Sequence, residues 1–204
     1  MKKIYLIDFD GTITKKDTLD FVAKRFFPDK YREWGKKIME KEYTVREWLA
    51  AFEETFNVPK DVYDKALKEI EIDESFLEFI NNNKCAVVSG GFDYNIKEIL
   101  ERYMDTDKIK IYANELVYKD NNRVVINKIH ENIDCSSCAV CKNNILKSYR
   151  QNYDEIIFIG DGITDVCVAQ ISDKIYAKQG LYLDKYLTER NIEHEVFNRF
   201  AEIK

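Results

Sequence analysis

The spacing of the hydrophobic positions changes twice along the chain. Residues 3–9 form a short apolar run that ends in acidic residues and a glycine, which is typical of a buried strand. Over residues 17–82 the apolar positions recur every three or four residues, and this spacing predicts several amphipathic helices. Beyond residue 85, short apolar runs alternate with helical patterns. The chain therefore predicts one strand, a block of helices, and then alternating strands and helices.

The second half of the chain predicts a parallel sheet. The pattern predicts strands at 85–88, 156–159 and 174–177, a hairpin of 109–117 with 124–129, and helices at 95–104, 141–149, 165–171 and 181–190. Strands that alternate with helices form α/β folds with helices on the faces of the sheet. The helical block before residue 85 is too long for a crossover, so we expect a separate helical cap inserted after the first strand.

The composition narrows the classes of function. The chain has 204 residues, of which 45% are hydrophobic and 34% charged, as in soluble globular proteins. Its net charge of -5 argues against non-specific binding of nucleic acid, which needs a basic surface. No apolar run approaches the ~20 residues of a membrane helix, and Asp8 and Asp10 interrupt the only run that resembles a signal peptide. We expect a cytoplasmic protein with five reduced cysteines and no membrane partner.

Acidic residues gather where two of the predicted strands end. Asp8 and Asp10 follow the first strand, and Asp161 and Asp165 follow the strand at 156–159. Ligands of open parallel sheets bind at the carboxyl ends of the strands, so we expect these four carboxylates to lie near one another. Carboxylates that close together repel one another unless a cation lies between them, and Mg²⁺ prefers such oxygen ligands. The spacing therefore predicts a Mg²⁺ site at this edge of the sheet.

The same edge predicts a phosphate site. Ser89, Gly90 and Gly91 follow the strand at 85–88, and they combine a hydroxyl with backbone N–H groups that no side chain shields. Lys142, at the start of a predicted helix, supplies a positive charge. Five of the seven glycines lie in these strand-end segments: Gly11, Gly90, Gly91, Gly160 and Gly162. Carboxylates beside a phosphate cradle indicate phosphoryl-transfer chemistry.

These segments resemble the four motifs of the haloacid dehalogenase-like (HAD) superfamily. The matching residues are Asp8-Phe9-Asp10-Gly11-Thr12-Ile13-Thr14, Ser89, Lys142 and Gly160-Asp161-Gly162-Ile163-Thr164-Asp165. The resemblance covers the whole chain and implies a Rossmann-like core, residues 1–14 and 75–204. It also implies a small helical cap at 15–74, of the kind found in phosphoserine phosphatase relatives, and a phosphatase that acts on a small phosphorylated metabolite.

The resemblance implies a role for each matching residue. Asp8 would attack phosphorus and form an aspartyl-phosphate, and Asp10 would act as general acid and then as general base. Asp8, Asp161 and the backbone carbonyl of Asp10 would bind Mg²⁺. Asp165 would orient Lys142 or support the metal site from behind. The residues implied to bind the phosphate oxygens are Ser89, Gly90 and Lys142.

The resemblance narrows the substrate through a few further positions. Phosphoserine phosphatases typically have serine and asparagine where this chain has Gly11 and Thr164. The cysteine-rich run 135–141 is similar to the 2-hydroxy-3-keto-5-methylthiopentenyl-1-phosphate phosphatases of methionine salvage and to the phosphoethanolamine, phosphocholine and pyridoxal phosphatases. We interpret the chain as a phosphatase of the first kind, with phosphoserine and phosphoethanolamine or phosphocholine as alternative substrates. In the cap, Asp17 and Arg46 are the candidates for substrate contact.

Other hypotheses stay open from the sequence. His130, Cys135, Cys138 and Cys141 have the donor atoms of a zinc site, but the three thiols crowd into one short run, so we favour a loop of reduced cysteines. A non-enzymatic module that senses phosphate or metal would have the same fold, although the complete catalytic set argues against it. We expect a monomer or a homodimer.

Overall fold

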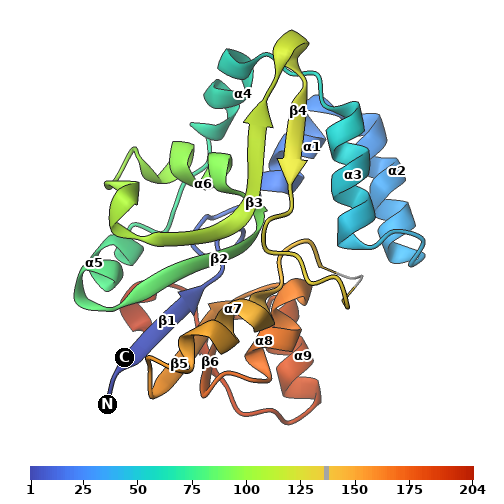
Figure 1. Cartoon of the computed structure of the whole chain (residues 1–204). Helices are drawn as coiled ribbons and strands as arrows, with labels where there is room; N and C mark the ends of the chain where they lie inside the picture. The colour runs from blue at the N-terminus through green and yellow to red at the C-terminus, as the bar shows by residue number, and fades with distance from the viewer. Residues whose placement is uncertain (136–137) are drawn as a thin grey trace.

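The computed structural model describes residues 1–135 and 138–204. These residues form a seven-stranded sheet in the order β4-β3-β2-β1-β5-β6-β7, with helices packed on its faces (Figure 1). Neighbouring strands are parallel, except that β3 and β4 form an antiparallel hairpin. The strands are β1 (Lys3–Ile7), β2 (Cys85–Phe92), β3 (Lys110–Tyr118), β4 (Val124–Asn127), β5 (Glu155–Gly160), β6 (Lys174–Lys178) and β7 (Glu195–Phe197).

The helices alternate with these strands after a first helical block. They are α1 (Thr18–Phe26), α2 (Pro28–Met39), α3 (Val45–Thr55), α4 (Lys60–Leu67), α5 (Ser75–Asn82), α6 (Asp93–Leu100), α7 (Lys142–Tyr149), α8 (Val166–Ala169) and α9 (Tyr182–Glu189). Short 3-10 turns lie at Thr106–Lys108, Asp120–Asn122, Ile163–Asp165 and Phe200–Glu202. The predicted α/β class is confirmed, and so is the predicted hairpin.

The central strand β1 shows why the sheet has helices on two faces. Side chains alternate across a strand, and all but the first residue of β1 are buried. Tyr5 and Ile7 pack into the hydrophobic cluster that continues into α1–α6, whereas Ile4 and Leu6 pack into the cluster that includes α7–α9. An apolar run without polar positions thus places β1 in the middle of the sheet, and its carboxyl end becomes the centre of the site.

The two segments that connect the helical block to the sheet lie side by side. Thr14 and Ile72 form an isolated antiparallel bridge, and the Lys15 N–H donates to the Glu71 carbonyl at 2.9 Å. Helices α1–α4 lie between these two crossings, next to the β3–β4 hairpin in Figure 1, and α3 contacts β4. Aromatic rings fill the interior of the block, among them Phe27, Trp34, Phe52 and Phe56.

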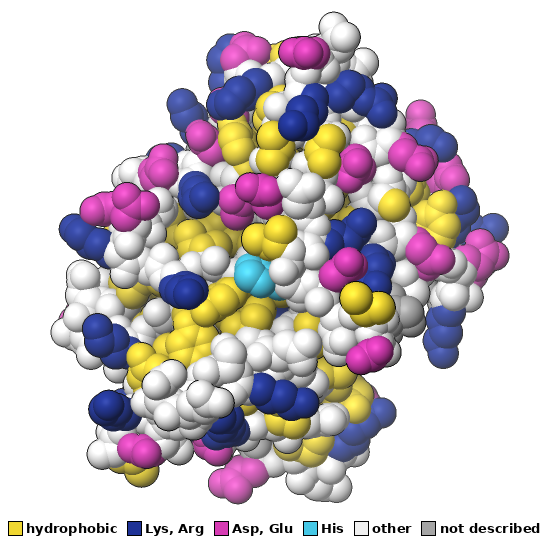
Figure 2. All heavy atoms as spheres, in the orientation of Figure 1, with side chains coloured by type: hydrophobic (Ala, Val, Ile, Leu, Met, Phe, Trp, Pro, Cys, Tyr) yellow, Lys and Arg dark blue, Asp and Glu magenta, His cyan; other side chains and the backbone are white. Residues whose placement is uncertain are grey.

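Two strands differ from the sequence expectation. β2 continues through Gly90 and Gly91 to Phe92, and its pairing with β3 shifts register between Val88 and Phe92. The pattern did not predict β7, because its three residues expose two side chains and bury only Phe197. In the described part of the chain, the helices are too short or too polar to traverse a bilayer. Figure 2 shows acidic and basic side chains intermixed over the viewed face, in keeping with the weak net charge.

Candidate active site

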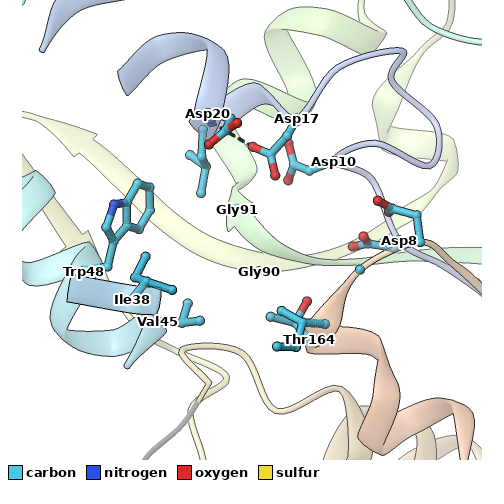
Figure 3. Close-up of a pocket in the computed structure, with 14 residues that line it drawn as sticks. Asp8, Asp10, Asp17, Asp20, Ile38, Val45, Trp48, Gly90, Gly91 and Thr164 are labelled. Carbon is cyan, nitrogen blue, oxygen red and sulfur yellow. Dashed lines mark hydrogen bonds between the residues drawn. The ribbon is translucent and has the colours of Figure 1, made fainter. Parts of the chain in front are cut away.

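A cavity of about 240 Å³ opens at the carboxyl ends of β1, β2 and β5 (Figure 3). Its lining comes from the sheet, from the turn after β5 and from helices α1–α3. The lining residues are Asp8, Asp10, Asp17, Leu19, Asp20, Ile38, Val45, Trp48, Gly90, Gly91, Asp161, Gly162, Ile163 and Thr164. Of the site residues predicted at the strand ends and at the start of α7, Asp8, Asp10, Gly90 and Asp161 line this cavity, whereas Ser89, Lys142 and Asp165 are buried outside its lining.

Asp8 lies at the inner end of this cavity. Its N–H donates to the Ile159 carbonyl of β5 at 2.8 Å, which continues the sheet pairing one residue beyond β1. Only 5% of Asp8 is exposed. Its Oδ1 accepts a hydrogen bond from the Lys142 ammonium at 2.7 Å. Asp8 is thus a fixed carboxylate that touches both a buried cation and the cavity.

Lys142 joins two carboxylates below the cavity. It is the first residue of α7, and the buried Ala139 and Val140 anchor the segment that leads into this helix. Its Nζ donates to Asp8 Oδ1 and, at 2.5 Å, to Asp165 Oδ1. Burial alone lowers the pKa of Lys142, but Asp165 and Asp8 outweigh it and raise the pKa above its ordinary value. Lys142 therefore remains charged although it is almost completely buried.

Asp165 holds the turn after β5 as well as Lys142. Its Oδ2 accepts hydrogen bonds from the N–H groups of Asp161 at 3.0 Å and Gly162 at 2.9 Å. Gly160 leaves the space that this carboxylate occupies, since a Cβ there would lie 2.5 Å from Asp165 Oδ2. The Asp161 side chain is positioned by Thr12, whose hydroxyl donates to its Oδ1 at 2.6 Å. Asp165 thus connects the lysine to the loop that presents Asp161.

Asp10 is held by three donors from two elements. Its Oδ2 accepts from the Ser89 hydroxyl at 2.8 Å, and its Oδ1 accepts from the Thr18 N–H at 3.1 Å and the Thr18 hydroxyl at 2.5 Å. The Ser89 hydroxyl in turn accepts from the Gly91 N–H at 2.8 Å. Gly91 permits this approach, because a Cβ at that position would lie 2.5 Å from Asp10 Oδ2.

A buried chain of polar side chains continues behind Asp10. The Asn95 amide of α6 donates to the Thr18 hydroxyl at 3.4 Å, and the Tyr63 hydroxyl of α4 donates to Asn95 Oδ1 at 2.9 Å. All three side chains are fully buried. Sequence reasoning missed this hydrogen-bonded series. Its members come together only when α1, α4 and α6 pack, and no local sequence motif marks them. Only Thr18 stands near a motif residue in the sequence.

The carboxylates fit a divalent cation. One oxygen from each of Asp8, Asp161 and Asp165 lies within 4.8 Å of the others. Among the residues that the structure describes, Lys142 is the one cation paired with any of the three. Gly11 has a φ of 81°, and a Cβ there would lie 2.6 Å from Asp161 Oδ2, so glycine keeps the approach to this carboxylate open. Hard oxygen ligands with excess negative charge are the donor set that Mg²⁺ prefers.

Electrostatics in the cluster agrees with this fit. Burial raises the pKa of Asp8 well above its ordinary value, Asp165 raises it further, and Lys142 opposes both. Burial and the Asp165 carboxylate likewise raise the pKa of Asp161 to about 6. Both shifts have the cause that a bound cation would remove, namely negative charges crowded away from water.

The two candidate substrate residues of the helical block differ in position. Asp17 caps α1, where its Oδ1 accepts from the Asp20 N–H at 2.8 Å, and it lines the cavity beside Asp10 (Figure 3). Loss of solvation among the atoms packed around it, and then the charge of the Asp10 carboxylate, raise the pKa of Asp17 to about 7, although part of its surface stays open to the cavity. Arg46 does not line the cavity. Its guanidinium donates to three carbonyls of the cysteine-rich segment, those of Asn132, Cys135 and Cys138.

The candidate zinc ligands do not assemble in the described residues. Within residues 1–135 and 138–204, the Asp8, Asp161 and Asp165 group is the one set of three or more such side chains close enough to share a cation. His130 instead stacks edge-on against Tyr112, and its carbonyl accepts from the Cys141 N–H at 2.8 Å. The segment thus leads into α7 and places Lys142.

The comparisons with known proteins agree with the fold and site. The family model of haloacid dehalogenase-like hydrolases matches residues 5–170, so the chain belongs to the haloacid dehalogenase-like hydrolases. A relative named 2-hydroxy-3-keto-5-methylthiopentenyl-1-phosphate phosphatase, from Bacillus pumilus (strain SAFR-032), is 30% identical over 215 residues, which cover 100% of this chain and 90% of the relative. A relative of the same name from Bacillus cereus (strain AH820) is 28% identical over 208 residues, 97% of this chain and 92% of the relative.

Solved structures give the same fold. The structure of a substrate-bound phosphoserine phosphatase superimposes with a TM-score of 0.73 and 24% identity. The match covers 100% of this chain and 97% of the phosphoserine phosphatase chain. Family, relatives and fold together make the protein a phosphatase, a phosphoric monoester hydrolase, as the sequence predicted.

Proposed function

We propose that the protein hydrolyses a small-metabolite phosphomonoester through an aspartyl-phosphate on Asp8, in a reaction that depends on Mg²⁺. The observation that carries this proposal is the Asp8 carboxylate itself. It faces the cavity, is almost fully buried, and is held by the Lys142 ammonium at 2.7 Å. A carboxylate so fixed has its nucleophilic oxygen positioned before the substrate arrives.

The first step forms a bond between Asp8 and phosphorus. As the carboxylate attacks, the bond between phosphorus and the leaving oxygen breaks, and Asp10 donates a proton to that oxygen. In the second step Asp10 takes a proton from water, whose oxygen attacks phosphorus and releases phosphate from Asp8. The hydroxyls of Ser89 and Thr18 support this exchange, because a hydroxyl donates to the ionised carboxylate and accepts from the protonated one.

Ser89, Gly90 and Lys142 are proposed to bind the phosphate oxygens. Lys142 has three N–H donors, and Asp8 and Asp165 accept from it. One donor thus remains for phosphate. Gly90 lines the cavity, and a Cβ at this position would meet nothing within 4 Å, so the backbone there is open to a ligand.

Asp8, Asp161 and the backbone carbonyl of Asp10 are proposed to hold Mg²⁺, with Asp165 supporting the site from behind. When bound, Mg²⁺ neutralises negative charge on the phosphoryl group and on the carboxylates. The raised pKa values of Asp8 and Asp161 support this assignment, since a cation would keep both groups ionised.

The names of the relatives supply the candidate substrate. We propose 2-hydroxy-3-keto-5-methylthiopentenyl-1-phosphate, from the relatives that match over nearly the whole chain. Phosphoserine is the second candidate, from the structural neighbour.

Residues 15–74 would act as a cap over a core of 1–14 and 75–204, and the Thr14–Ile72 bridge supports this division. We further propose that the protein is cytoplasmic, a compartment in which the thiols of its five cysteines would stay reduced.

A panel of phosphomonoesters tests this function. Phosphate release would be measured with Mg²⁺ and with EDTA, on p-nitrophenyl phosphate, phosphoserine and the methylthiopentenyl phosphate. We expect turnover with Mg²⁺ and its loss with EDTA. An absence of turnover on every ester with Mg²⁺ would instead favour a non-enzymatic phosphate- or metal-sensing module.

A further inference from the structure

The cavity in front of Asp8 has two chemically different sides (Figure 3). Asp10, Asp17 and Asp20 lie on one side, near the start of α1. Ile38 of α2 and Val45 and Trp48 of α3 lie together on the other, across Gly90 and Gly91 from Asp8. The leaving oxygen of a phosphoryl group at Asp8 would lie near Asp10, its proposed acid, and the far end of the leaving alcohol can extend past Gly90 and Gly91 to the apolar side.

The apolar side presents side-chain surface to the cavity. Ile38 is 44% exposed, and Val45 and Trp48 are half-buried. The Trp48 ring is fixed from behind by Trp34 and Phe52, whose ring centroids lie 6.1 and 5.6 Å away. When an apolar ligand displaces water from a fixed apolar wall, the free energy of binding becomes more favourable in proportion to the area covered.

The same cavity offers nothing to a carboxylate beyond the phosphoryl end. Among the described residues that line it, none is lysine, arginine or histidine. Lys142 is paired with Asp8 and Asp165 below the floor, and Arg46 donates to backbone carbonyls of the cysteine-rich segment. A carboxylate on the leaving alcohol would lie either beside these acidic side chains or against the apolar wall, without a cation among the described lining residues to receive it, and both positions are unfavourable.

We infer that this phosphatase is specific for phosphomonoesters of alcohols that carry a short apolar chain and no carboxylate, and that Ile38, Val45 and Trp48 select them. The inference rests on the proposed function and names the substrate class of the same site. It rejects phosphorylated amino acids and hydroxy acids, phosphoserine included.

Matched esters test the selection. Ethyl phosphate, n-pentyl phosphate and 4-phosphooxybutanoate would be compared by kcat/KM with Mg²⁺. We expect n-pentyl phosphate to exceed ethyl phosphate by about 10- to 100-fold, because three more methylene groups reach the apolar wall. We expect it to exceed 4-phosphooxybutanoate, of similar length but charged, by roughly 100-fold.

Two outcomes of this comparison would overturn the inference. One is turnover of 4-phosphooxybutanoate or phosphoserine at or above the kcat/KM of n-pentyl phosphate. The other is equal turnover of the ethyl and pentyl esters. Either result leaves the proposed phosphatase standing, whereas an absence of turnover on all esters would reject the phosphatase and the inference together.

A pair of neighbouring variants localises the effect. Ile38→Ser places a polar group on the apolar wall, and we expect kcat/KM for n-pentyl phosphate to fall about 10-fold while that for ethyl phosphate stays the same. Met39→Ser is the control, because Met39 is 78% exposed on the same helix and does not line the cavity. Equal effects of both variants, or equal effects of Ile38→Ser on both esters, would contradict the assignment of the wall.

Discussion

Individual side chains carry most of the chemistry, and the tightest group is Lys142 with its two carboxylates. Both partners are buried with it, and neither has another lysine or arginine within ion-pair distance in the described structure. Removing the ammonium would leave two buried carboxylates without their cation, which is more costly than losing an exposed ion pair.

Lys142→Met is therefore expected to lower the free energy of unfolding by about 3–5 kcal/mol and to abolish phosphatase activity. Lys65→Met is the matched control, because Lys65 pairs with Asp61 on an exposed face of α4, and we expect it to change stability by less than about 1 kcal/mol. Urea unfolding monitored by circular dichroism measures both. Equal losses in the two variants would contradict the buried charge arrangement.

The glycine beside Asp10 offers a second test. In Gly91→Ala the new methyl group would lie 2.5 Å from Asp10 Oδ2 and 3.1 Å from Ser89 Oγ, so the carboxylate must move. We expect kcat to fall by roughly 100-fold, since small misplacements of catalytic groups have effects of this size. Gly35→Ala, where a Cβ meets nothing within 4 Å, should retain kcat within about twofold of the wild type, because nothing has to move. Unchanged kcat in Gly91→Ala would argue against Asp10 as acid and base.

Sequence reasoning predicted site residues from short motifs but not the side chains that support them. Asp8, Ser89, Lys142 and Asp161 stand in short motifs, each after a strand or at a helix start, so the chain itself identifies them. Asn95 gives no such signal, because a single asparagine in a helix is usually solvated. Its contact with Thr18 exists only once α1 and α6 pack together.

At the scale of helices and strands, packing of α1, α4 and α6 positions the Asp10 carboxylate. Thr18 on α1, Asn95 on α6 and Tyr63 on α4 form a buried hydrogen-bonded chain that ends at Asp10. Three helices thus fix one carboxylate. Movement of the helical block relative to the sheet would change the donors of Asp10.

Thr18→Val tests this connection, because it removes the hydroxyl and keeps the shape and the N–H donor. We expect kcat to fall about 10-fold with little change in KM, and the pH dependence of kcat to shift, since one donor to Asp10 is lost. Thr188→Val, on an exposed position of α9, serves as the control. A variant with the wild-type pH profile of kcat would show that the chain has only a structural role.

The order of helices and strands was largely predictable from the sequence, whereas the residues at which they begin and end were less predictable. The long helical block and the later alternation gave clear periodicities, which is why the α/β class was confirmed. β2 extends beyond its apolar run because Asn114 of β3 donates from its side chain to the Gly90 carbonyl at 2.8 Å. β7 depends on tertiary contact with β6, and its three residues are too few for a pattern.

At the scale of the whole molecule, Asp73 joins the segment that follows α4 to the C-terminal segment. Asp73, just after the helical block, accepts from the Phe200 N–H at 2.8 Å and from the Ser75 hydroxyl at 2.7 Å. Burial alone raises the pKa of Asp73, but the hydrogen bonds from Ser75 and Phe200, with the charge of Lys178, outweigh it and lower the pKa below its ordinary value. The ionised carboxylate therefore stabilises the folded chain.

This shift predicts a pH dependence of stability. A depressed pKa in the folded state means that the unfolded chain binds a proton more readily, so the contribution of Asp73 is present above about pH 4 and is lost as the pH falls through the folded value. Asp73→Asn should lower stability at pH 7 by about 1–3 kcal/mol and flatten the decline below pH 4. Thermal unfolding between pH 3 and 7 measures this, with the exposed Asp61→Asn as control. Parallel pH curves for Asp73→Asn and the wild type would contradict it.

Chemical trapping of the intermediate tests most directly whether Asp8 is the nucleophile. Borohydride reduces an aspartyl-phosphate to homoserine, and peptide mass spectrometry locates the reduced residue. After a rapid quench of the protein turning over a phosphomonoester with Mg²⁺, we predict homoserine in place of Asp8 and at no other aspartate. Turnover without homoserine at position 8, or homoserine at Asp10 or Asp161 instead, would contradict this mechanism.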